Sequence, residues 1–412
     1  GGYDKKLKTW RMEDLPMMPE RFKLVVIPQT RGQFQAVKSL IERKDVAEII
    51  IATDAGREGE LVARWILAKA GNKKPLKRLW ISSVTDKAIR DGFAHLKNAK
   101  EYENLYHAAT ARAESDWRVG INATRALTCK YNAQLSCGRV QTPTLAMIAA
   151  REEEIRHFTP KPYYGLQLTG KGITFTWKDK KSGSSATFSK EKNEEIYKNL
   201  SGKTAVVAEV KKTKKTSQAE GLYDLTDLSR DANQRFGFSA KQTLNIMQSL
   251  YEHHKVLTYP RTDCNYLNST DKFSEMIQSA ASIPGYEIIA KEALKNIESV
   301  KKNKKFVNNE ELKKHGHSAL CPTDIPADFS ALSSDEQIIY KLVCRRYLAI
   351  FLPPMLQKKT TIIVQNNGEL FRATGKQIIE RGFTDFLNIN SKDEELPMVK
   401  KDDVLKVTSK KI

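Results

Sequence analysis

The chain has 412 residues, enough for two to four domains that each bury a core. Lys and Arg number 69 against 49 Asp and Glu, so the formal net charge is +20, and a chain this basic favours a polyanionic partner, nucleic acid by default. No apolar run reaches the roughly 18 residues of a membrane span, the start is unlike a signal peptide, and five scattered cysteines without a CxxC pair argue against a zinc ribbon and a disulfide framework. We therefore expect a cytoplasmic protein without zinc.

The first two regions are predicted to differ in secondary structure. Residues 22–90 alternate short β-branched runs (LVVIP, EIIIATD, LKRLWISS) with amphipathic helical patterns, which predicts βα units around a parallel sheet. Residues 101–157 are helical in pattern almost throughout.

The rest of the chain is predicted to be two β-rich regions separated by helices. Apolar and polar residues alternate in YYGLQLTG, ITFTWKD and TAVVAEV, a pattern typical of antiparallel strands that end in the basic run KKTKK. Helices follow over 222–252, where Ser239 and Gln242 predict a capping box, and over 335–350. Two helices followed by an extended segment resemble a winged helix-turn-helix, and strands resume in KTTIIVQ, ELFRATG and VLKVTS.

A group of acidic residues follows the predicted buried strand EIIIATD. Asp54 ends that strand, and Glu58 lies in the first turn of the next helix, so both sit where α/β sheets bind ligands. The two carboxylates are suited to share a hard cation such as Mg²⁺, with Arg57 facing phosphate. The alternative is that Glu58 and Glu60 only complement the helix dipole.

The segment KVLTYPRTD pairs a tyrosine with an arginine across a proline. Pro260 pushes Tyr259 into an extended conformation, in which residues two apart share a face, so Tyr259 and Arg261 are predicted to project side by side. A guanidinium stabilises a phenolate and grips phosphate, so the pair is suited to attack on a phosphodiester. The alternative is an ordinary strand-end aromatic beside a surface charge.

Two further segments are predicted to contact phosphate. In LSCGRVQTPTL, Gly138 permits close backbone approach, and Thr142 and Pro143 are predicted as N-cap and first residue of a helix whose N-terminus, with Arg139, binds an anion. On the preceding helix a polar stripe recurs with Trp117 at its edge; its members are Arg118, Asn122 and Arg125. A capped turn and a solvated helix face are the alternatives.

Taken together, ATDAGREGE, SCGRVQTPTL and TYPRTD resemble the type IA DNA topoisomerases, specifically the bacterial topoisomerase III branch, from about Tyr3 to Ile412. The resemblance implies an α/β plus mixed α+β, multi-domain, toroidal core with a Toprim domain and a transient 5′-phosphotyrosine link to single-stranded DNA. Its expected domains are a partial Toprim domain (1–100), a helical DNA-groove domain (101–160), a β-rich arch in two parts (161–218 and 353–412) and a winged-helix-like domain carrying the tyrosine (219–352).

The same resemblance implies roles for particular residues. Tyr259 matches the nucleophile and Arg261 the transition-state arginine, which also contacts DNA. Asp54 and Glu58 match the first and last acids of the DxDxE motif that holds Mg²⁺, and His317, in an HxAxxPT pattern, matches a catalytic histidine, whereas His315 is expected to be a loop neighbour. The DNA contacts implied or supported by the resemblance are Trp10, Trp117, Arg118, Arg125, Ser136, Gly138, Arg139 and Gln141; core packing is the alternative for Trp10.

Two departures from the family pattern stand out. Gly56 occupies the position of the middle acid of DxDxE, so the expected metal site has one carboxylate fewer. The family's first Toprim strand, with its glutamate, has no counterpart before Gly1, and the sequence KVTSKKI ends inside a strand pattern, so we expect a fragment trimmed at both ends.

These observations predict an ATP-independent isomerase that cleaves single-stranded DNA, passes a strand and religates it, relaxing negative supercoils or decatenating DNA. Its expected partners are single-stranded and underwound duplex DNA near the nucleoid, with Mg²⁺ as cofactor and the protein a monomer. The alternatives are a catalytically impaired fragment that only binds single-stranded DNA, and another Toprim enzyme, a nuclease or primase.

Overall fold

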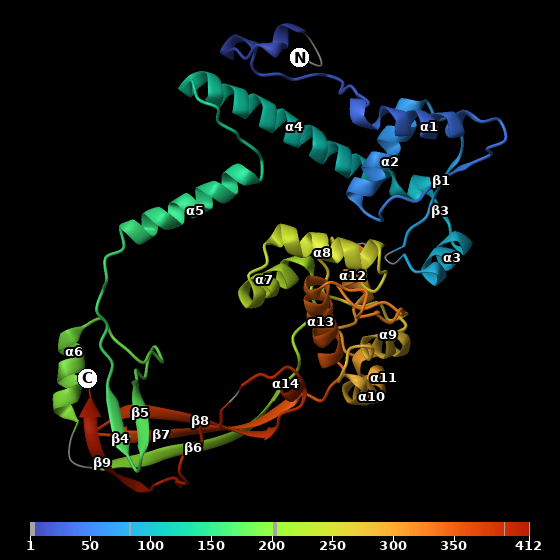
Figure 1. The fold of residues 1–412 in the computed structure, drawn as a ribbon. Helices are drawn as coiled ribbons and strands as arrows, with labels where there is room; N and C mark the ends of the chain where they lie inside the picture. The colour runs from blue at the N-terminus through green and yellow to red at the C-terminus, as the bar shows by residue number, and fades with distance from the viewer. Residues whose placement is uncertain (1–4, 82–83, 201–203, 316, 391, 412) are drawn as a thin grey trace. The chain divides into compact units, whose positions relative to one another are not determined.

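The computed structural model describes residues 5–81, 84–200, 204–315, 317–390 and 392–411 (Figure 1). The chain divides into two units. Unit 1 comprises Gly1–Phe158, Tyr251–Tyr259 and Leu312–Ser318, and unit 2 comprises Thr159–Leu250, Pro260–Glu311 and Ala319–Ile412. The division into five domains stays a prediction.

Unit 1 contains a small three-stranded sheet of order β1-β2-β3, in which β1 and β2 are parallel and β2 and β3 antiparallel. Its strands and helices in chain order are α1 (Arg31–Glu42), β1 (Ile49–Ile51), α2 (Arg57–Ala70), β2 (Leu76–Arg78), α3 (Asp86–Ala94), β3 (Lys97–Asn98), α4 (Glu103–Tyr131) and α5 (Gln141–Arg156). Short 3-10 turns occupy Lys5–Lys8, Met12–Asp14, Pro28–Thr30 and Ala99–Tyr102.

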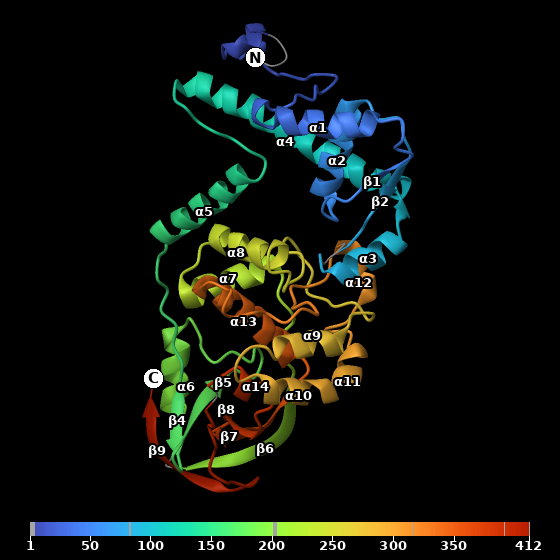
Figure 2. The same ribbon diagram turned by 45° about the vertical axis from the view of Figure 1, so that its right-hand side comes forward.

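The core of unit 1 forms because α1 and α2 turn apolar stripes toward β1. Ile41, Ile51, Ala63 and Leu67 are buried in one cluster. α2 ends at Gly71, whose φ of 74° is a left-handed conformation that favours glycine. On its other side α2 packs along the long helix α4 (Figures 1 and 2).

One predicted strand of unit 1 is absent. The apolar run at residues 24–27 is irregular and joins no ladder among the described residues, and Val25 and Ile27 are exposed. The parallel sheet predicted there is therefore reduced to the β1–β2 pair. An apolar run becomes a strand only when a neighbour supplies partners for its backbone groups, and sequence alone does not reveal that neighbour.

Unit 2 contains a closed barrel of order β4-β5-β8-β7-β6-β9. Its strands are β4 (Gln167–Gly170), β5 (Ile173–Lys178), β6 (Thr204–Ser217), β7 (Met355–Asn366), β8 (Glu369–Glu380) and β9 (Val404–Lys411), and α6 (Lys190–Asn199) lies between β5 and β6 in the chain. Strands from the two predicted β-rich regions thus join in one barrel. Alternation along β5 buries Ile173, Phe175 and Trp177 against Val364 and Phe371.

Apart from α6, the helices that unit 2 contains wholly or in part lie between β6 and β7 in the chain, except for the last one. They are α7 (Leu225–Phe236), α8 (Ala240–Glu252), α9 (Phe273–Ala280), α10 (Glu287–Lys295), α11 (Ile297–Lys301), α12 (Asn309–His315), α13 (Ser334–Ala349) and α14 (Phe383–Phe386). The Ser239 hydroxyl accepts the Gln242 amide hydrogen at 3.1 Å, as predicted, while the Gln242 side chain donates to Asp335 at 3.1 Å. No described helix is long and apolar enough to cross a bilayer.

We expect Phe371→Ala to lower the opening free energy of the barrel by about 3–5 kcal/mol, because it leaves a cavity in a core where Phe371 is fully buried. Hydrogen exchange of the β7 and β8 amides measures this locally. Phe188→Ala is the control: Phe188 is 76% exposed, so its removal should change the value by less than about 0.5 kcal/mol. A similar small change for Phe371→Ala would contradict the assigned core.

Candidate active site

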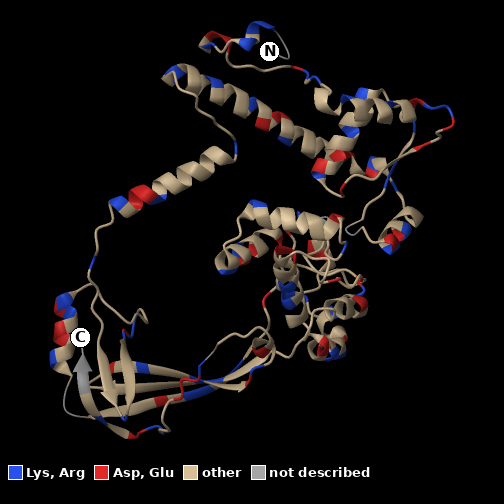
Figure 3. Cartoon of the chain, viewed as in Figure 1, with Lys and Arg blue, Asp and Glu red and all other residues tan. Residues whose placement is uncertain are grey.

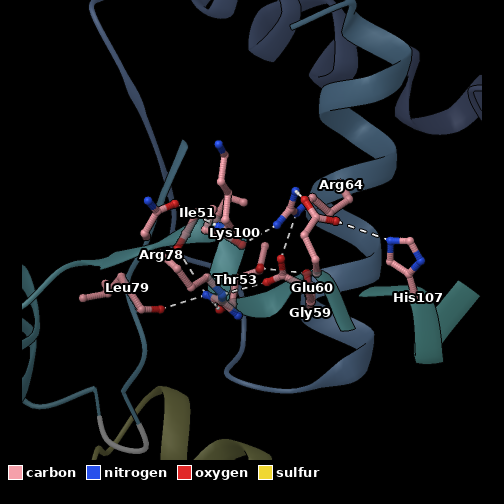
Figure 4. Close-up of polar contacts among 12 residues, drawn as sticks. Ile51, Thr53, Gly59, Glu60, Arg64, Arg78, Leu79, Lys100 and His107 are labelled. Atoms are coloured by element: carbon pink, nitrogen blue, oxygen red, sulfur yellow. Dashed lines mark hydrogen bonds and ion pairs between the residues drawn. The ribbon is translucent and has the colours of Figure 1, made fainter. Parts of the chain in front are cut away.

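A buried arginine holds the loop that carries the predicted acids (Figure 4). Arg78, at the end of β2, donates through Nε to Oε2 of Glu60 at 2.9 Å, and both side chains are fully buried. Its Nη1 donates to the carbonyl oxygens of Ile51 at 3.1 Å and Thr53 at 2.7 Å, and its Nη2 donates to that of Asp54 at 2.6 Å. One guanidinium therefore fixes the whole turn from β1 into α2.

The turn is also sterically tight. A Cβ at Gly59 would lie 2.1 Å from the carbonyl oxygen of Asp54, so only glycine fits there. The Thr53 hydroxyl donates to the Gly59 carbonyl at 2.8 Å. Burial lowers the pKa of Arg78, while the neighbouring Glu60 carboxylate raises it and so favours the charged form.

The two predicted metal ligands lie on this fixed turn. Asp54 and Glu58 are both exposed, with Oε1 of Glu58 3.4 Å from Nη1 of Arg112 on α4. Between them Gly56 has an extended backbone (φ −176°, ψ 176°) that any residue adopts. Among the residues that the structure describes, no group of three or more His, Cys, Asp or Glu side chains is placed to bind a metal. The turn presents two exposed carboxylates.

A column of near-parallel rings leads to the predicted nucleophile. We call Tyr102, Trp80, His317 and Tyr259 the aromatic column. Tyr102 stacks on Trp80 with centroids 4.6 Å apart, Trp80 lies 6.4 Å from the His317 ring, and His317 stacks on Tyr259 at 4.3 Å. The interplanar angles are 20°, 16° and 25° in that order. Tyr251 meets Tyr259 edge-on at 5.5 Å.

The aromatic column lies next to the acidic turn. A Cβ at Gly56 would be 3.9 Å from Nε2 of His317, which is ordinary contact distance. The pKa of the Tyr251 phenol is raised, chiefly by burial and further by the charge of Asp54 and by Tyr259. Nearby negative charge disfavours a phenolate. His317 is 5% exposed, so the predicted histidine is built into the site rather than into a surface loop.

The pairing of Tyr259 with Arg261 was predicted from an extended backbone, and it stays a prediction. The backbone is irregular at Tyr259 and bends at Pro260 and Arg261. Tyr259 belongs to unit 1 and the exposed Arg261 to unit 2. The proline thus produces a bend where we expected an extended chain. His315 also differs from expectation, because it is the last residue of α12 and not part of a loop.

The segment before α5 departs from its predicted cap. α5 begins at Gln141, so Thr142 and Pro143 lie inside its first turn. The Thr142 hydroxyl instead accepts the Gly138 amide hydrogen at 3.0 Å, which folds the preceding loop back on the helix. Pro143 is tolerated because a first-turn residue needs no amide hydrogen. Ser136, Arg139 and Gln141 are exposed around this turn.

Arg139 does not point freely into solvent. Its Nε lies 2.7 Å from Oδ1 of Asp116, and Oδ2 of Asp116 lies 3.9 Å from Nε of Arg112, the residue that also approaches Glu58. These four side chains form a chain of alternating charge from the acidic turn to the loop before α5. All are at least 43% exposed, so each pair is individually weak.

The polar stripe of α4 binds the first described residues of the chain. Asn122 accepts the Met17 amide hydrogen at 2.5 Å and donates to the Met17 carbonyl at 3.0 Å. Nη2 of Arg118 donates to the Pro19 carbonyl at 3.4 Å, and Nη2 of Arg125 to that of Leu7 at 2.9 Å. The stripe is therefore not a solvated face.

This packing brings predicted DNA-contact residues together. The Arg125 guanidinium lies 5.1 Å from the Trp10 ring, which is 41% exposed and so not core, and Trp117 meets Phe22 edge-on at 5.2 Å. Among the described atoms, Nε and Nη1 of Arg125 and Nε of Arg118 are buried without a hydrogen-bond acceptor. Unpaired buried donors are costly, so these are suited to receive an anion.

Sequence reasoning missed several residues of the site. Arg78, Trp80 and Tyr102 lie far from the acids and the tyrosine in sequence, and nothing in their local pattern marks them. Arg112 and Asp116 carried a signal, because opposite charges four apart on a helix attract.

Comparisons with known proteins agree on one family. Residues 100–412 match the family described as DNA topoisomerase. The chain is 53% identical to DNA topoisomerase 3 of Bacillus licheniformis and 52% identical to that of Bacillus subtilis, over 99% and 98% of its own length but 57% and 56% of theirs. It thus spans little more than half of these relatives. The structure of full-length topoisomerase I from Thermotoga maritima is similar with a TM-score of 0.69 and 24% identity, covering 94% of this chain and 62% of that one.

Replacing Arg78 by Met should lower the opening free energy of the β1–β2 region by about 3–5 kcal/mol, because Glu60 would remain as a buried charge without its partner. Hydrogen exchange of the β1 and β2 amides is the measurement. As a control, Arg43→Met breaks a pair with Asp45 in which both side chains are more than half exposed, and should leave these rates unchanged. Unchanged rates in both variants would refute the role given to Arg78.

Proposed function

The chain belongs to the type IA DNA topoisomerase family, and we propose that it carries the reaction centre of a topoisomerase III that cleaves and rejoins single-stranded DNA through Tyr259. The observation that supports this most directly is the stacking of Tyr259 on the buried His317 beside the turn that bears Asp54 and Glu58. The match of residues 100–412 to the topoisomerase family argues against the Toprim nuclease or primase alternative.

Family membership confirms the resemblance that the sequence motifs indicated, including the topoisomerase III branch. Similarity to the Thermotoga maritima structure likewise confirms a multi-domain fold of mixed α and β structure. Members of this family are isomerases that bind DNA.

In the proposed reaction the Tyr259 oxygen loses its proton and attacks the phosphorus of a phosphodiester. The bond from phosphorus to the 3′ oxygen breaks, the 3′-hydroxyl leaves, and the 5′ phosphate stays on the tyrosine. Since one phosphoester replaces another, the step needs no ATP. Arg261 stabilises the phenolate and the pentacovalent phosphate. His317, held by ring stacking, donates to a nonbridging oxygen or orients a carboxylate.

Asp54 and Glu58 are proposed to hold Mg²⁺. They are exposed carboxylates on a turn fixed by Arg78, and Mg²⁺ typically takes one or two carboxylates with water and phosphate oxygens. The donor chemistry therefore fits. Bound there, Mg²⁺ would supply positive charge for aligning the DNA ends during religation. Glu58 would also serve as the catalytic acid of the motif, with Arg112 close by.

Single-stranded DNA is proposed to lie along α4 and the loop before α5. Support comes from the unpaired donors of Arg118 and Arg125, the exposed ring of Trp10 and the exposed Arg139. Bases stack on aromatic rings while guanidinium groups contact phosphates. The remaining proposed contacts are Trp117, Ser136, Gly138, Gln141 and Arg261.

The whole protein is proposed to relax negative supercoils or decatenate DNA, acting as a monomer on single-stranded and underwound duplex DNA near the nucleoid in the cytoplasm. The proposal needs no zinc. A chimaera that places this chain between the flanking sequences of the Bacillus subtilis relative provides the full-length context in which to test activity.

We expect Tyr259→Phe to abolish the covalent adduct in the chain and in the chimaera, with single-strand binding unchanged, because only the attacking oxygen is removed. A single-stranded oligonucleotide labelled at its 3′ end reports the adduct as an SDS-stable shift. Tyr251→Phe is the matched control: it removes the neighbouring hydroxyl and should retain the adduct. An adduct in Tyr259→Phe would refute the nucleophile, and no adduct in any version would refute the proposed function.

Gly56→Asp should tighten Mg²⁺ binding by on the order of tenfold, because a third carboxylate raises affinity for a hard cation. The backbone at Gly56 suits any residue and its Cβ meets only His317, at 3.9 Å, so the variant should fold. Calorimetric titration with Mg²⁺ measures the change. Gly32→Asp is the control, since a Cβ there meets nothing within 4 Å and adds the same charge on α1. Equal affinities in the two variants would contradict the metal site.

A further inference from the structure

Three neighbouring barrel strands carry lysines on the side that points away from the barrel core. Val210, Ile362 and Ala373 pair across β6, β7 and β8 and pack into the core. Successive residues of a strand face opposite sides. On each strand, the residues one, three or five positions from the core residue therefore face outward. The outward positions form what we call the outer lysine face, which comprises Lys211, Thr213 and Lys215 of β6, Lys359 and Thr361 of β7, and Thr374 and Lys376 of β8.

The register places like charges in direct opposition on this face. Lys359 of β7 pairs with Lys376 of β8, and Thr213 of β6 completes their row. On the core side of the same strands, Lys214 pairs with Lys358. Like charges directly opposite each other destabilise a sheet, so this arrangement costs the barrel stability.

The acidic residues that the structure describes do not neutralise these lysines. None of the four lysines of the outer lysine face forms an ion pair with a described carboxylate. Glu394 meets Lys376 through backbone hydrogen bonds of 2.9 and 3.0 Å. Glu209, two residues before Lys211 on β6, faces the same side, and no described ion pair joins it to these lysines. Elsewhere in the barrel unit a lysine has its counter-charge, as in the 2.9 Å pair of Lys192 with Asp179. Figure 3 shows the basic segments on these strands.

We propose that the outer lysine face binds the phosphate backbone of double-stranded DNA, at a site separate from the single-strand contacts of unit 1. This inference rests on the proposed function, which makes DNA the ligand. A bound polyanion would offset the repulsion between these lysines. Threonine hydroxyls between the lysines add neutral donors for phosphate oxygens.

Two features favour a duplex over a single strand. Proteins that hold single strands stack bases on aromatic rings, and the outer lysine face contains lysine and threonine but no aromatic residue. Duplex DNA also carries about twice the axial charge density of one strand, one charge per roughly 1.7 Å. Lysines are spaced by about 5 Å where they lie on neighbouring strands and by about 13 Å where they lie four residues apart along one strand, which suits several phosphates at once.

The test replaces Lys211, Lys215, Lys359 and Lys376 by Gln in the full chain. A second variant replaces Lys198, Lys291, Lys302 and Lys304, four exposed lysines outside these three strands, by Gln and lowers the net charge equally. Binding to a fluorescent 20-base-pair duplex and to a 20-nucleotide single strand is measured from 50 to 200 mM salt. Each phosphate contact contributes about 0.9 to the magnitude of the slope of log K against log salt for duplex binding. That magnitude should therefore fall by about 3 to 4 in the first variant and by much less in the second.

Single-strand affinity should stay within about twofold in both variants, because the proposed groove of unit 1 is untouched. The melting temperature of the first variant should be unchanged or higher, since repulsion is removed; a lower one would mean that the lysines are structural and would overturn the inference. So would equal duplex slopes in the two variants, or equal losses for duplex and single strand. If the unaltered chain bound the single strand but not the duplex, this inference would be overturned and the proposed function would stand; if it bound neither DNA, both would be overturned.

Discussion

The buried ion pair between Arg78 and Glu60 is the interaction on which the candidate active site depends. Removing two charges from water is costly, and here the cost is offset because the guanidinium uses nearly all of its donors on Glu60 and on three carbonyls of one turn. The carbonyl of Asp54 is among them. The exposed carboxylates thus gain a fixed position without being buried themselves, which leaves them free to meet a cation and phosphate.

A second constraint links that turn to the tyrosine. Trp80 follows Arg78 by two residues, and its ring lies 5.1 Å from the Arg78 guanidinium. The same ring lies 6.4 Å from that of His317, which stacks on Tyr259. Stacked rings have few degrees of freedom, so stacking on His317 restricts the orientation of the Tyr259 phenol. The arginine that holds the acids therefore also supports the column that orients the proposed nucleophile.

The charge of the chain is distributed in two different ways. In unit 1, exposed arginines alternate with acids, from Glu58 of α2 through Arg112 and Asp116 of α4 to Arg139 in the loop before α5. Because each of these ion pairs is weak, they break readily when phosphate competes for the arginines. On the barrel, lysines stand opposite lysines without that balance. The first pattern suits a site that opens to substrate, and the second suits a surface that holds a polyanion.

By itself, the sequence determined the features that depend on local chemistry. Strand alternation in ITFTWKD, the amphipathic helical patterns within residues 22–90 and the motifs around Asp54, Gly138 and Tyr259 were sufficient to predict these elements, the family and the residues to examine. Its errors were also local. The apolar run at 24–27 found no strand partner, Pro260 produced a bend, and α5 began two residues before its predicted start because the Thr142 hydroxyl bonded to Gly138.

Only the tertiary structure decided which distant residues support the site. Tyr102, Trp80 and His317 stack although they lie far apart along the chain, and Arg78 bonds to four residues of the segment from Ile51 to Glu60. The same holds for the lysine rows, which depend on the register of β6 against β7, because more than a hundred residues separate β6 from the β7–β8 hairpin. Such contacts arise from packing and backbone pairing between elements, and a sequence records each element's own preferences but not its neighbours.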